Sequence, residues 1–314
     1  MVRDFIHNHF KHFNAGILAK CSKSLRSFLE DDGRLMLTLA GAMSTAEIGR
    51  SLAPAIRSNK VHAICCTGAN LEEDLFRLVA GKYYEKIPNW RDFTAKDDAE
   101  LAERGMNRVT DIAIPEEQAI RYIEKTLLKL WKKAELSGTR KFPHEYLFDV
   151  LADENIEYDR NSKESWLLAA KEMNLPIFVP GWEDSTLGNI LVARVIDGTL
   201  KTPDIVKGGL HAMYELAHWY REDNMPTGIL QVGGGIAGDF PICVVPMLRQ
   251  DIGEDVSLWS WFAQISESRP SYGGYSGAPP NEKISWGKLG IDTPKFVIES
   301  DASIVLPLIL ASLA

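Results

Sequence analysis

Six apolar runs, each ending in small or acidic residues, constrain the fold more than any other feature of this 314-residue chain. In each run the apolar residues follow one another instead of alternating with polar ones. Continuous apolarity of this kind is typical of strands covered on both faces, as in parallel sheets. The runs are residues 35–42, 61–67, 175–180, 228–235, 256–265 and 295–301.

Segments with helical periodicity lie between these runs. Residues 115–136 are the clearest, because a proline and two glutamates open the segment and lysines come late, as a helix dipole favours. Alternating strands and helices predict an α/β fold with a doubly wound, mostly parallel, Rossmann-like sheet flanked by helices. The other segments of helical period are residues 143–151, 163–173 and 202–220.

The expected organisation is an N-terminal helical extension, residues 1–34, followed by a single α/β domain, residues 35–314. The extension would pack on the outside of the core or on another subunit. Residues 81–114 are polar and weakly periodic, which indicates an insertion or surface arm. The apolar run 304–314 is too short to span a bilayer, so no membrane partner is expected.

Composition narrows the function. The chain is 45% hydrophobic and 25% charged, with a net charge of −8 and scattered basic residues. This balance gives no electrostatic footprint for nucleic acid, and it suits either a small cationic substrate or plain solubility. The four cysteines lack metal-ligand spacing, so no metal site is expected, and they fit a reducing compartment. Without a secretory signal at the N-terminus, a cytoplasmic location is expected.

Polar and glycine-rich segments follow several of the expected strands, where parallel sheets bind their ligands. Residues 67–74 read TGANLEED and open a helix whose amide end would favour a phosphate. We expect Glu72, Glu73 and Asp74 in its first turn, either capping helices or binding a cationic amine. Glycines 233–235 let backbone amides approach a phosphate or ring, although three glycines also form ordinary tight turns.

The segment 271–288, SYGGYSGAPPNEKISWGK, is the most informative. Its glycines and prolines shape a loop that delivers Glu282, Trp286 and Lys288 together. A lysine beside a tryptophan can be partly desolvated, which makes its amine a nucleophile for an imine or carbonyl carbon. Taken alone, Lys288 would be read as a surface lysine, as most lysines are.

The histidines favour packing over metal binding. His62 begins an apolar run, and His211 and His218 are seven residues apart on one expected helix.

The motif SGAPPNEKISWGK followed by VIESDASIVLPLI strongly resembles the deoxyhypusine synthase family, whose members have SGA, a glutamate, SWGK and then an ADAS-type element. TGANLEED is similar to the family's TAGG-x-EED, and WEDSTLGN is similar to TDGSLGD. The triple glycine also matches. The resemblance covers most of the chain beyond about residue 35, and it is closest to the bacterial deoxyhypusine synthase-like group.

This resemblance implies NAD-dependent transfer of an aminobutyl group from a polyamine such as spermidine to an acceptor amine, through an imine on a lysine. The acceptor would be a protein lysine or, as in a homospermidine synthase-like enzyme, a small amine. It also implies a homotetramer with NAD sites shared across a dimer interface.

Where this sequence matches a family motif, the resemblance implies that the matching residue has the family's role. Lys288 would be the nucleophile, Trp286 would stack on the amine chain, and Glu282 and Glu73 would hold its ammonium ends. The residues implied for NAD are Thr67, Gly68, Asp184, Gly234, Gly235, Ser276, Asp301 and Ala302.

Three residues depart from the family pattern at positions that recognise the polyamine. Asn189 and Tyr275 stand where the family has aspartates, and Asp239 stands where a histidine usually follows the triple glycine. A catalytically silent NAD-binding or scaffold protein would explain these departures as decay. A third possibility, separate from the departures, is an amine dehydrogenase, which would not need Lys288. Retention of Lys288, Glu282 and Trp286 argues against the silent protein and favours a transferase with altered substrate recognition.

Overall fold

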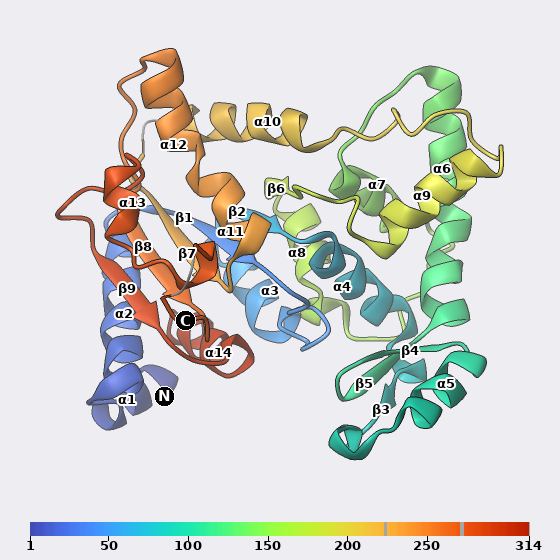
Figure 1. The fold of residues 1–314 in the computed structure, drawn as a ribbon, viewed down its shortest axis with the longest axis horizontal. Coiled ribbons are helices and arrows are strands. Elements are labelled where there is room, and N and C mark those ends of the chain that lie inside the picture. Colours follow the sequence, from blue (N-terminus) through green and yellow to red (C-terminus); the bar gives the residue numbers. More distant parts are fainter. Residues whose placement is uncertain (223–224, 271–272, 314) are drawn as a thin grey trace.

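The computed structural model describes residues 1–222, 225–270 and 273–313. Six strands form one sheet in the order β6-β2-β1-β7-β8-β9, and every neighbouring pair is parallel (Figure 1). The predicted fold class and all six predicted strands are confirmed. The largest difference between a predicted and an observed strand boundary is at β8, which begins at residue 261 instead of 256. The strands are β1 Arg34–Leu39, β2 Ala63–Cys66, β6 Ile177–Phe178, β7 Thr227–Val232, β8 Trp261–Ile265 and β9 Lys295–Ile298.

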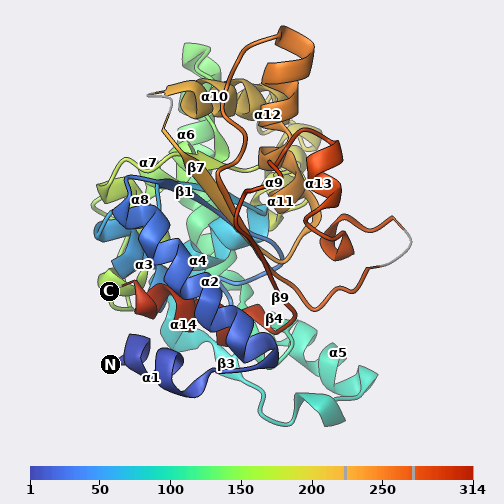
Figure 2. The same cartoon turned by 90° about the vertical axis from the view of Figure 1, so that its left-hand side faces the viewer.

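Both faces of the sheet are buried, which explains why the apolar runs are continuous. In β1, Leu35, Leu37 and Leu39 join one apolar cluster while Met36 joins the other. The first cluster includes side chains from α2, α3, α4, α8 and α14, and the second from α10, α11 and α12 (Figure 2). These helices are α2 Phe13–Glu30, α3 Gly49–Arg57, α4 Gly68–Ala80, α8 Trp166–Glu172, α10 Gly209–Arg221, α11 Gly235–Ile242, α12 Val244–Pro246 and α14 Ala302–Ser312.

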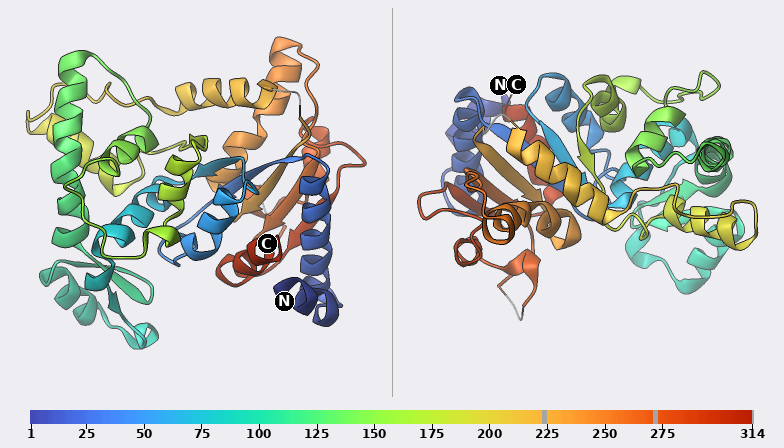
Figure 3. Two further views of the ribbon diagram at one scale, coloured as in Figure 1. Left: turned by 180° about the vertical axis from the view of Figure 1, so that it is seen from behind. Right: turned by 90° about the horizontal axis from the view of Figure 1, so that it is seen from above.

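The two chain ends lie side by side (Figure 3). Helix α1, Val2–His9, packs against α14, and α2 packs against β9. Leu18, Cys21 and Leu25 of α2 are buried in the same cluster as the sheet. The N-terminal helices therefore share an apolar core with the last helix of the chain.

The expected surface arm, residues 81–114, carries a small sheet of its own, seen at the lower right of Figure 1. Strands of two to four residues explain its weak periodicity, and Ile87, Leu101, Met106 and Ala113 form its core. The remaining elements are β3 Glu85–Lys86, β4 Met106–Val109, β5 Ile112–Pro115, α5 Ala95–Glu103, α6 Tyr122–Ser137, α7 Pro143–Val150, α9 Thr186–Ile196 and α13 Glu282–Ser285.

Two expected helices differ from the structure. The segment 115–136 begins with π-helical turns, Glu116–Arg121, before α6. The helix expected over 202–220 begins only at residue 209, because Gly208 and Gly209 interrupt the helical pattern.

The acids after β2 lie in the second turn of α4 and not in the first, because Thr67 caps the helix directly at the strand end. Two of them cap neighbouring helices. Glu72 accepts hydrogen bonds from Thr186 N and Leu187 N at the start of α9. Asp74 accepts from Ser165 Oγ and from Trp166 N and Leu167 N at the start of α8. Only Glu73 remains for a ligand.

Among the described residues, no helix is both long enough and apolar enough to cross a membrane. All four cysteines are free thiols, and burial raises the pKa of Cys21 to about 12.

Replacing Asp74 by alanine should destabilise the chain, because two buried amides and a hydroxyl at the start of α8 lose their acceptor. We expect the free energy of unfolding to fall by about 1–3 kcal/mol in urea titrations. The matched control is Glu154→Ala, which removes an exposed carboxylate. Equal stability of the two variants would contradict the capping role of Asp74.

Candidate active site

Lys288 lies in a tight turn that the backbone fixes to the sheet. Gly287 has φ +67°, a left-handed conformation that favours glycine. Lys288 N donates to the carbonyl of Lys283 (2.9 Å), and the Lys288 carbonyl accepts from Trp259 N (3.2 Å), just before β8. Lys288 is only 7% exposed, so it is not the surface lysine that its residue type alone would suggest.

The amine of Lys288 has one carboxylate partner and two aromatic neighbours. Its Nζ donates to Asp239 Oδ1 at 3.2 Å. It lies 5.7 Å from the ring centroid of Tyr275 and 5.8 Å from that of Trp286. Trp286 is itself 66% exposed, which leaves much of its ring free to contact a ligand.

Five predicted site residues line one cavity of about 760 Å³ around this amine. They come from α11, from the loop after β8 and from α13 with the turn that follows it, so folding brings together segments that are distant in the sequence. The cavity combines acidic, cationic and aromatic groups, as a site for a charged amine requires. The five are Asp239, Tyr275, Glu282, Trp286 and Lys288.

The Tyr275 side chain connects the loop after β8 to β7 and α11 by hydrogen bonds. Its hydroxyl donates to Gln231 Oε1 at 2.8 Å and lies 3.2 Å from the carbonyl oxygen of Gly238. Burial, followed by the charge of Asp239, raises the pKa of Tyr275 well above its usual range. The hydroxyl is therefore a donor at neutral pH, and its ring is the part that faces Lys288.

Among the residues of this cavity that the sequence did not predict are two with nucleophilic side chains, Lys283 and Cys243. Lys283 is 3% exposed, and burial, followed by the charge of Lys288, lowers its pKa to about 8. Cys243 lies four residues after Asp239 on α11 and the following turn, with Sγ 3.6 Å from Asp239 Oδ1. The pattern EKIS gives no signal for a buried lysine. For Cys243, the i, i+4 spacing from Asp239 could have predicted that the two side chains are neighbours on one helical face.

A second, open cavity of about 590 Å³ holds Glu73, Asp184 and Asn189 between α4 and α9. The Asn189 amide donates to the carbonyls of Ser185 (2.7 Å) and Glu183 (3.1 Å), so its donors bind backbone. Glu73 differs, because Oε2 is buried and has no hydrogen-bond partner among the described residues. Burial, and then the charge of Glu72, raises the pKa of Glu73 to about 7.

The glycines lie where the strand order reverses, between β1 and β7. Gly41 after β1 and Gly235 after β7 have positive φ and open space where a Cβ would lie. Gly235 N donates to Ser276 Oγ (3.2 Å), and Gly234 packs so closely on Ser276 that a Cβ would come within 1.9 Å of its Oγ. Ser276 is thereby fixed beside the triple glycine.

The other residues predicted for NAD occupy helix starts at this carboxyl edge. Thr67 caps α4, accepting from Asn70 N (3.2 Å) and donating to the Gly41 carbonyl (2.8 Å). Gly68 packs on Ser185, next to Asp184. Asp301 caps α14, which begins at Ala302, by accepting from Ser303 N (2.7 Å).

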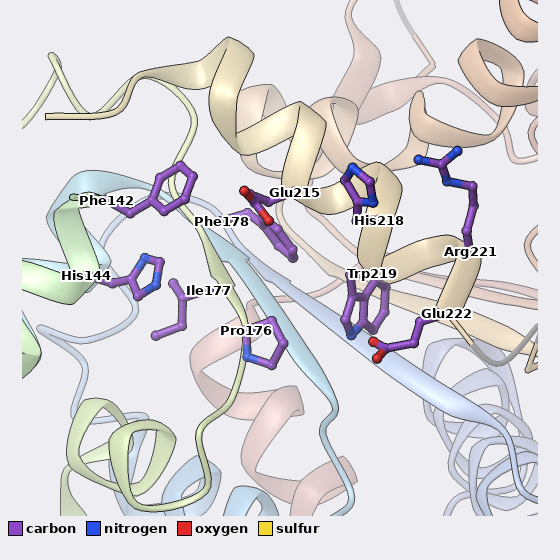
Figure 4. Close-up of a pocket in the computed structure, with 10 residues that line it drawn as sticks. All are labelled: Phe142, His144, Pro176, Ile177, Phe178, Glu215, His218, Trp219, Arg221 and Glu222. Atoms are coloured by element: carbon purple, nitrogen blue, oxygen red, sulfur yellow. The ribbon is translucent and has the colours of Figure 1, made fainter. Parts of the chain in front are cut away.

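Another cavity, of about 640 Å³, lies at the opposite edge of the sheet, between α7, β6 and α10 (Figure 4). Pro176 precedes β6 and Glu222 follows α10, so this is the amino edge of the strands. The cavity contains none of the predicted site residues. His218 lines this cavity, and its ring centroid lies 4.4 Å from that of Tyr214 in an edge-to-face arrangement. Elsewhere, at the start of β2, His62 Nδ1 accepts a hydrogen bond from Leu35 N. No metal-binding cluster occurs in the described part of the chain.

Comparisons with known proteins decide the family. The family model "Deoxyhypusine synthase" matches residues 6–313. The chain belongs to the deoxyhypusine synthase family. The assignment made from SGAPPNEKISWGK is therefore confirmed, and membership supports an aminobutyl-transfer function in general.

Relatives of the family span nearly the whole chain. A deoxyhypusine synthase-like protein of a Nostoc species is 30% identical over 99% of this chain and 80% of its own length. A probable deoxyhypusine synthase of Aeropyrum pernix is 30% identical over 95% of this chain and 88% of its own. The fold is similar to that of a putative deoxyhypusine synthase from Entamoeba histolytica, with TM-score 0.59 and 13% identity over 99% of this chain and 90% of that one.

The raised pKa of Glu73 predicts how the stability of the chain changes with pH. Because the folded-state pKa lies above the ordinary value of 4.5, the stability contributed by protonated Glu73 is present below about pH 4.5 and is lost as pH rises through about 7. Glu73→Gln removes this loss, so the variant should gain about 1–3 kcal/mol relative to the native chain between pH 5 and pH 8.

Urea unfolding at the two pH values measures the gain. Glu117→Gln, which changes an exposed glutamate, serves as the control and should follow the native chain. The same pH dependence in Glu73→Gln and in the native chain would show that Glu73 is not held in an apolar setting.

Proposed function

We propose that this chain transfers an aminobutyl group from a polyamine such as spermidine to an acceptor amine, with NAD as cofactor and Lys288 as the covalent carrier. The observation that carries the proposal is the buried Lys288 amine, held by Asp239 in a cavity with Glu282 and Trp286. It lies within the SWGK motif that matches the family. The acceptor is a protein lysine or a small amine.

The residues of the cavity suit an exchange between two amines at an imine carbon. The free amine of Lys288 bonds to the imine carbon of the oxidised donor, and the C–N bond to the departing amine breaks. The departing amine leaves with the two hydrogens that the Lys288 nitrogen gives up when it becomes an imine nitrogen. The acceptor amine reverses the exchange and frees Lys288. Enclosure protects these imines from hydrolysis.

Each neighbour of Lys288 has a role consistent with its position. Asp239 holds and orients the amine through the 3.2 Å contact. Trp286, with much of its ring exposed, offers a surface on which an alkyl amine chain can stack. Glu282 supplies a carboxylate for an ammonium end of the substrate. Buried and paired, Lys288 is not in the state expected of a silent scaffold protein.

The carboxyl edge of the sheet fits NAD. Open space beside Gly41 and Gly235 at the point where the strand order reverses allows close approach of a dinucleotide. The start of α4 at Thr67 and Gly68 suits its phosphates, and Ser276, Asp301 and Ala302 lie along the same edge. Bound NAD would accept a hydride from the donor carbon and return it after the exchange, and the family is generally NAD-dependent.

Two copies of the chain would complete the site, within a homotetramer typical of the family. Lys288 and Glu73 line separate cavities, and α13 and α9 lie far apart along the long axis in Figure 1. Exposed apolar side chains occur beside the triple glycine, on α9 and on α14, where a second copy would cover them. They are Ile236, Val192, Ile196 and Ile304. With free cysteines throughout, the reaction would take place in the cytoplasm.

Borohydride trapping tests the reaction. Incubation with NAD, spermidine and borohydride should give an aminobutyl adduct on the native chain that peptide mass spectrometry maps to Lys288. Lys288→Arg should give none, because a guanidinium stays protonated. Lys133→Arg, a change at an exposed lysine, is the matched control and should give the native yield.

Equal adduct on the native chain and Lys288→Arg, or an adduct mapped to a different lysine, would overturn the mechanism. The absence of NAD binding in calorimetric titration, with and without polyamine, would remove the transferase altogether.

A further inference from the structure

The amine of Lys283 is enclosed and unpaired beside the catalytic lysine. Lys283 is 3% exposed, and its Nζ is buried without a hydrogen-bond partner among the described residues. It lies 4.8 Å from the ring centroid of Tyr275 and 5.1 Å from that of Phe262. Its side chain also lines the cavity that holds Lys288.

A buried ammonium without a partner is costly, so an enclosed lysine that lines a cavity calls for a counter-ion. The nearby acids do not supply one. Asp239 of α11 pairs with Lys288, whereas Glu282 of α13 and Asp251, the third carboxylate of the cavity, are exposed, and none of the three forms an ion pair with Lys283 among the described residues. Tyr275 offers only its ring, because its hydroxyl is bonded to Gln231. Lys288 itself adds a second positive charge, and burial with this charge lowers the pKa of Lys283.

The cavity therefore holds charges of both signs: the ammonium groups of Lys283 and Lys288, and the carboxylates of Asp239, Asp251 and Glu282. A plain polyamine carries only positive charges, and one of its ammonium groups near Lys283 would be repelled. A ligand with a negative group near Lys283 and an ammonium near Glu282 would match both signs.

We propose that Lys283 binds a carboxylate of the substrate, so that one of the two amines handled at Lys288 is an amino acid type of amine and not a plain polyamine. This inference rests on the proposed function and narrows its substrate class. Lys283 is then a residue that determines specificity, while Lys288 carries the chemistry.

Two small probes of equal chain length separate the possibilities: 4-aminobutyrate, with one ammonium and one carboxylate, and butane-1,4-diamine, with two ammonium groups. Calorimetric titration into the NAD-loaded native chain should show tighter binding of 4-aminobutyrate, by about tenfold. In Lys283→Met, which keeps the length of the side chain, the ratio of the two affinities should change by about tenfold or more towards the diamine. Lys133→Met is the control and should keep the native ratio.

Proton uptake gives a second measurement that a purely structural role would not move. At about pH 8.5 much of Lys283 is deprotonated before binding, and a carboxylate beside it favours the charged form. Titration of 4-aminobutyrate in two buffers of different ionisation enthalpy should reveal proton uptake in the native chain and less in Lys283→Gln. This comparison stands even where Lys283→Met does not fold.

Tighter binding of the diamine by the native chain, an affinity ratio unchanged in Lys283→Met, equal proton uptake in Lys283→Gln, or binding of neither probe would each overturn the proposal. Borohydride trapping on the same preparations separates the two levels of inference. A normal adduct on Lys288 with unchanged selectivity refutes the role of Lys283 alone, whereas loss of all adduct in the native chain refutes the proposed reaction.

Discussion

The contact between Lys288 and Asp239 joins two segments that only the parallel sheet brings together. Asp239 lies on α11, directly after β7, and Lys288 lies between β8 and β9. Helix α11 packs against β1, β2 and β7, while the Lys288 backbone bonds to Trp259 just before β8, so the parallel pairing of β7 with β8 brings the two segments together. A slip in strand order would separate the lysine from its carboxylate. A lysine this deeply buried also needs its partner, since an unpaired buried charge is strongly destabilising.

The sequence predicts the sheet well because its strands are covered on both faces. Leu35, Leu37 and Leu39 belong to one apolar cluster and Met36 to the other, so both faces of β1 require apolar side chains and the run is nearly continuous, with Thr38 as the one buried polar residue of 35–39. The helix over 202–220 was placed too early because polar residues before Gly208 do not distinguish a loop from an exposed helical face. The acids of TGANLEED leave two alternatives open in the sequence, capping a helix or binding a cationic amine, and the structure shows Glu72 and Asp74 accepting hydrogen bonds at the starts of α9 and α8. Such contacts depend on tertiary neighbours that no local pattern reveals.

Residues of the candidate site could be predicted where a sequence motif determines the backbone conformation. They could not be predicted where burial depends on side chains from distant segments. The glycine of SWGK, Gly287, adopts the left-handed conformation that the turn before Lys288 requires, so the motif fixes the position of Lys288. Lys283, five residues earlier, looks like a solvated lysine in the sequence, yet the rings of Tyr275 and Phe262 enclose it. The positions that depart from the family motif have different surroundings. Asp239 and Tyr275 contact or flank Lys288, whereas the Asn189 amide donates to backbone carbonyls at the start of its own helix.

If two copies of the chain share each site, as we propose, Lys288 of one copy and Glu73 of the other serve one reaction, although the two residues line separate cavities of each chain. Mixing two inactive variants, Lys288→Arg and Glu73→Ala, after reversible dissociation tests this claim most directly, with formation of the borohydride-trapped adduct as the readout. If two copies share each site, random pairing should restore about one quarter of the native yield, because half of the pairs are mixed and each mixed pair contains one intact site. Mixtures that stay as inactive as the separate variants would contradict the account.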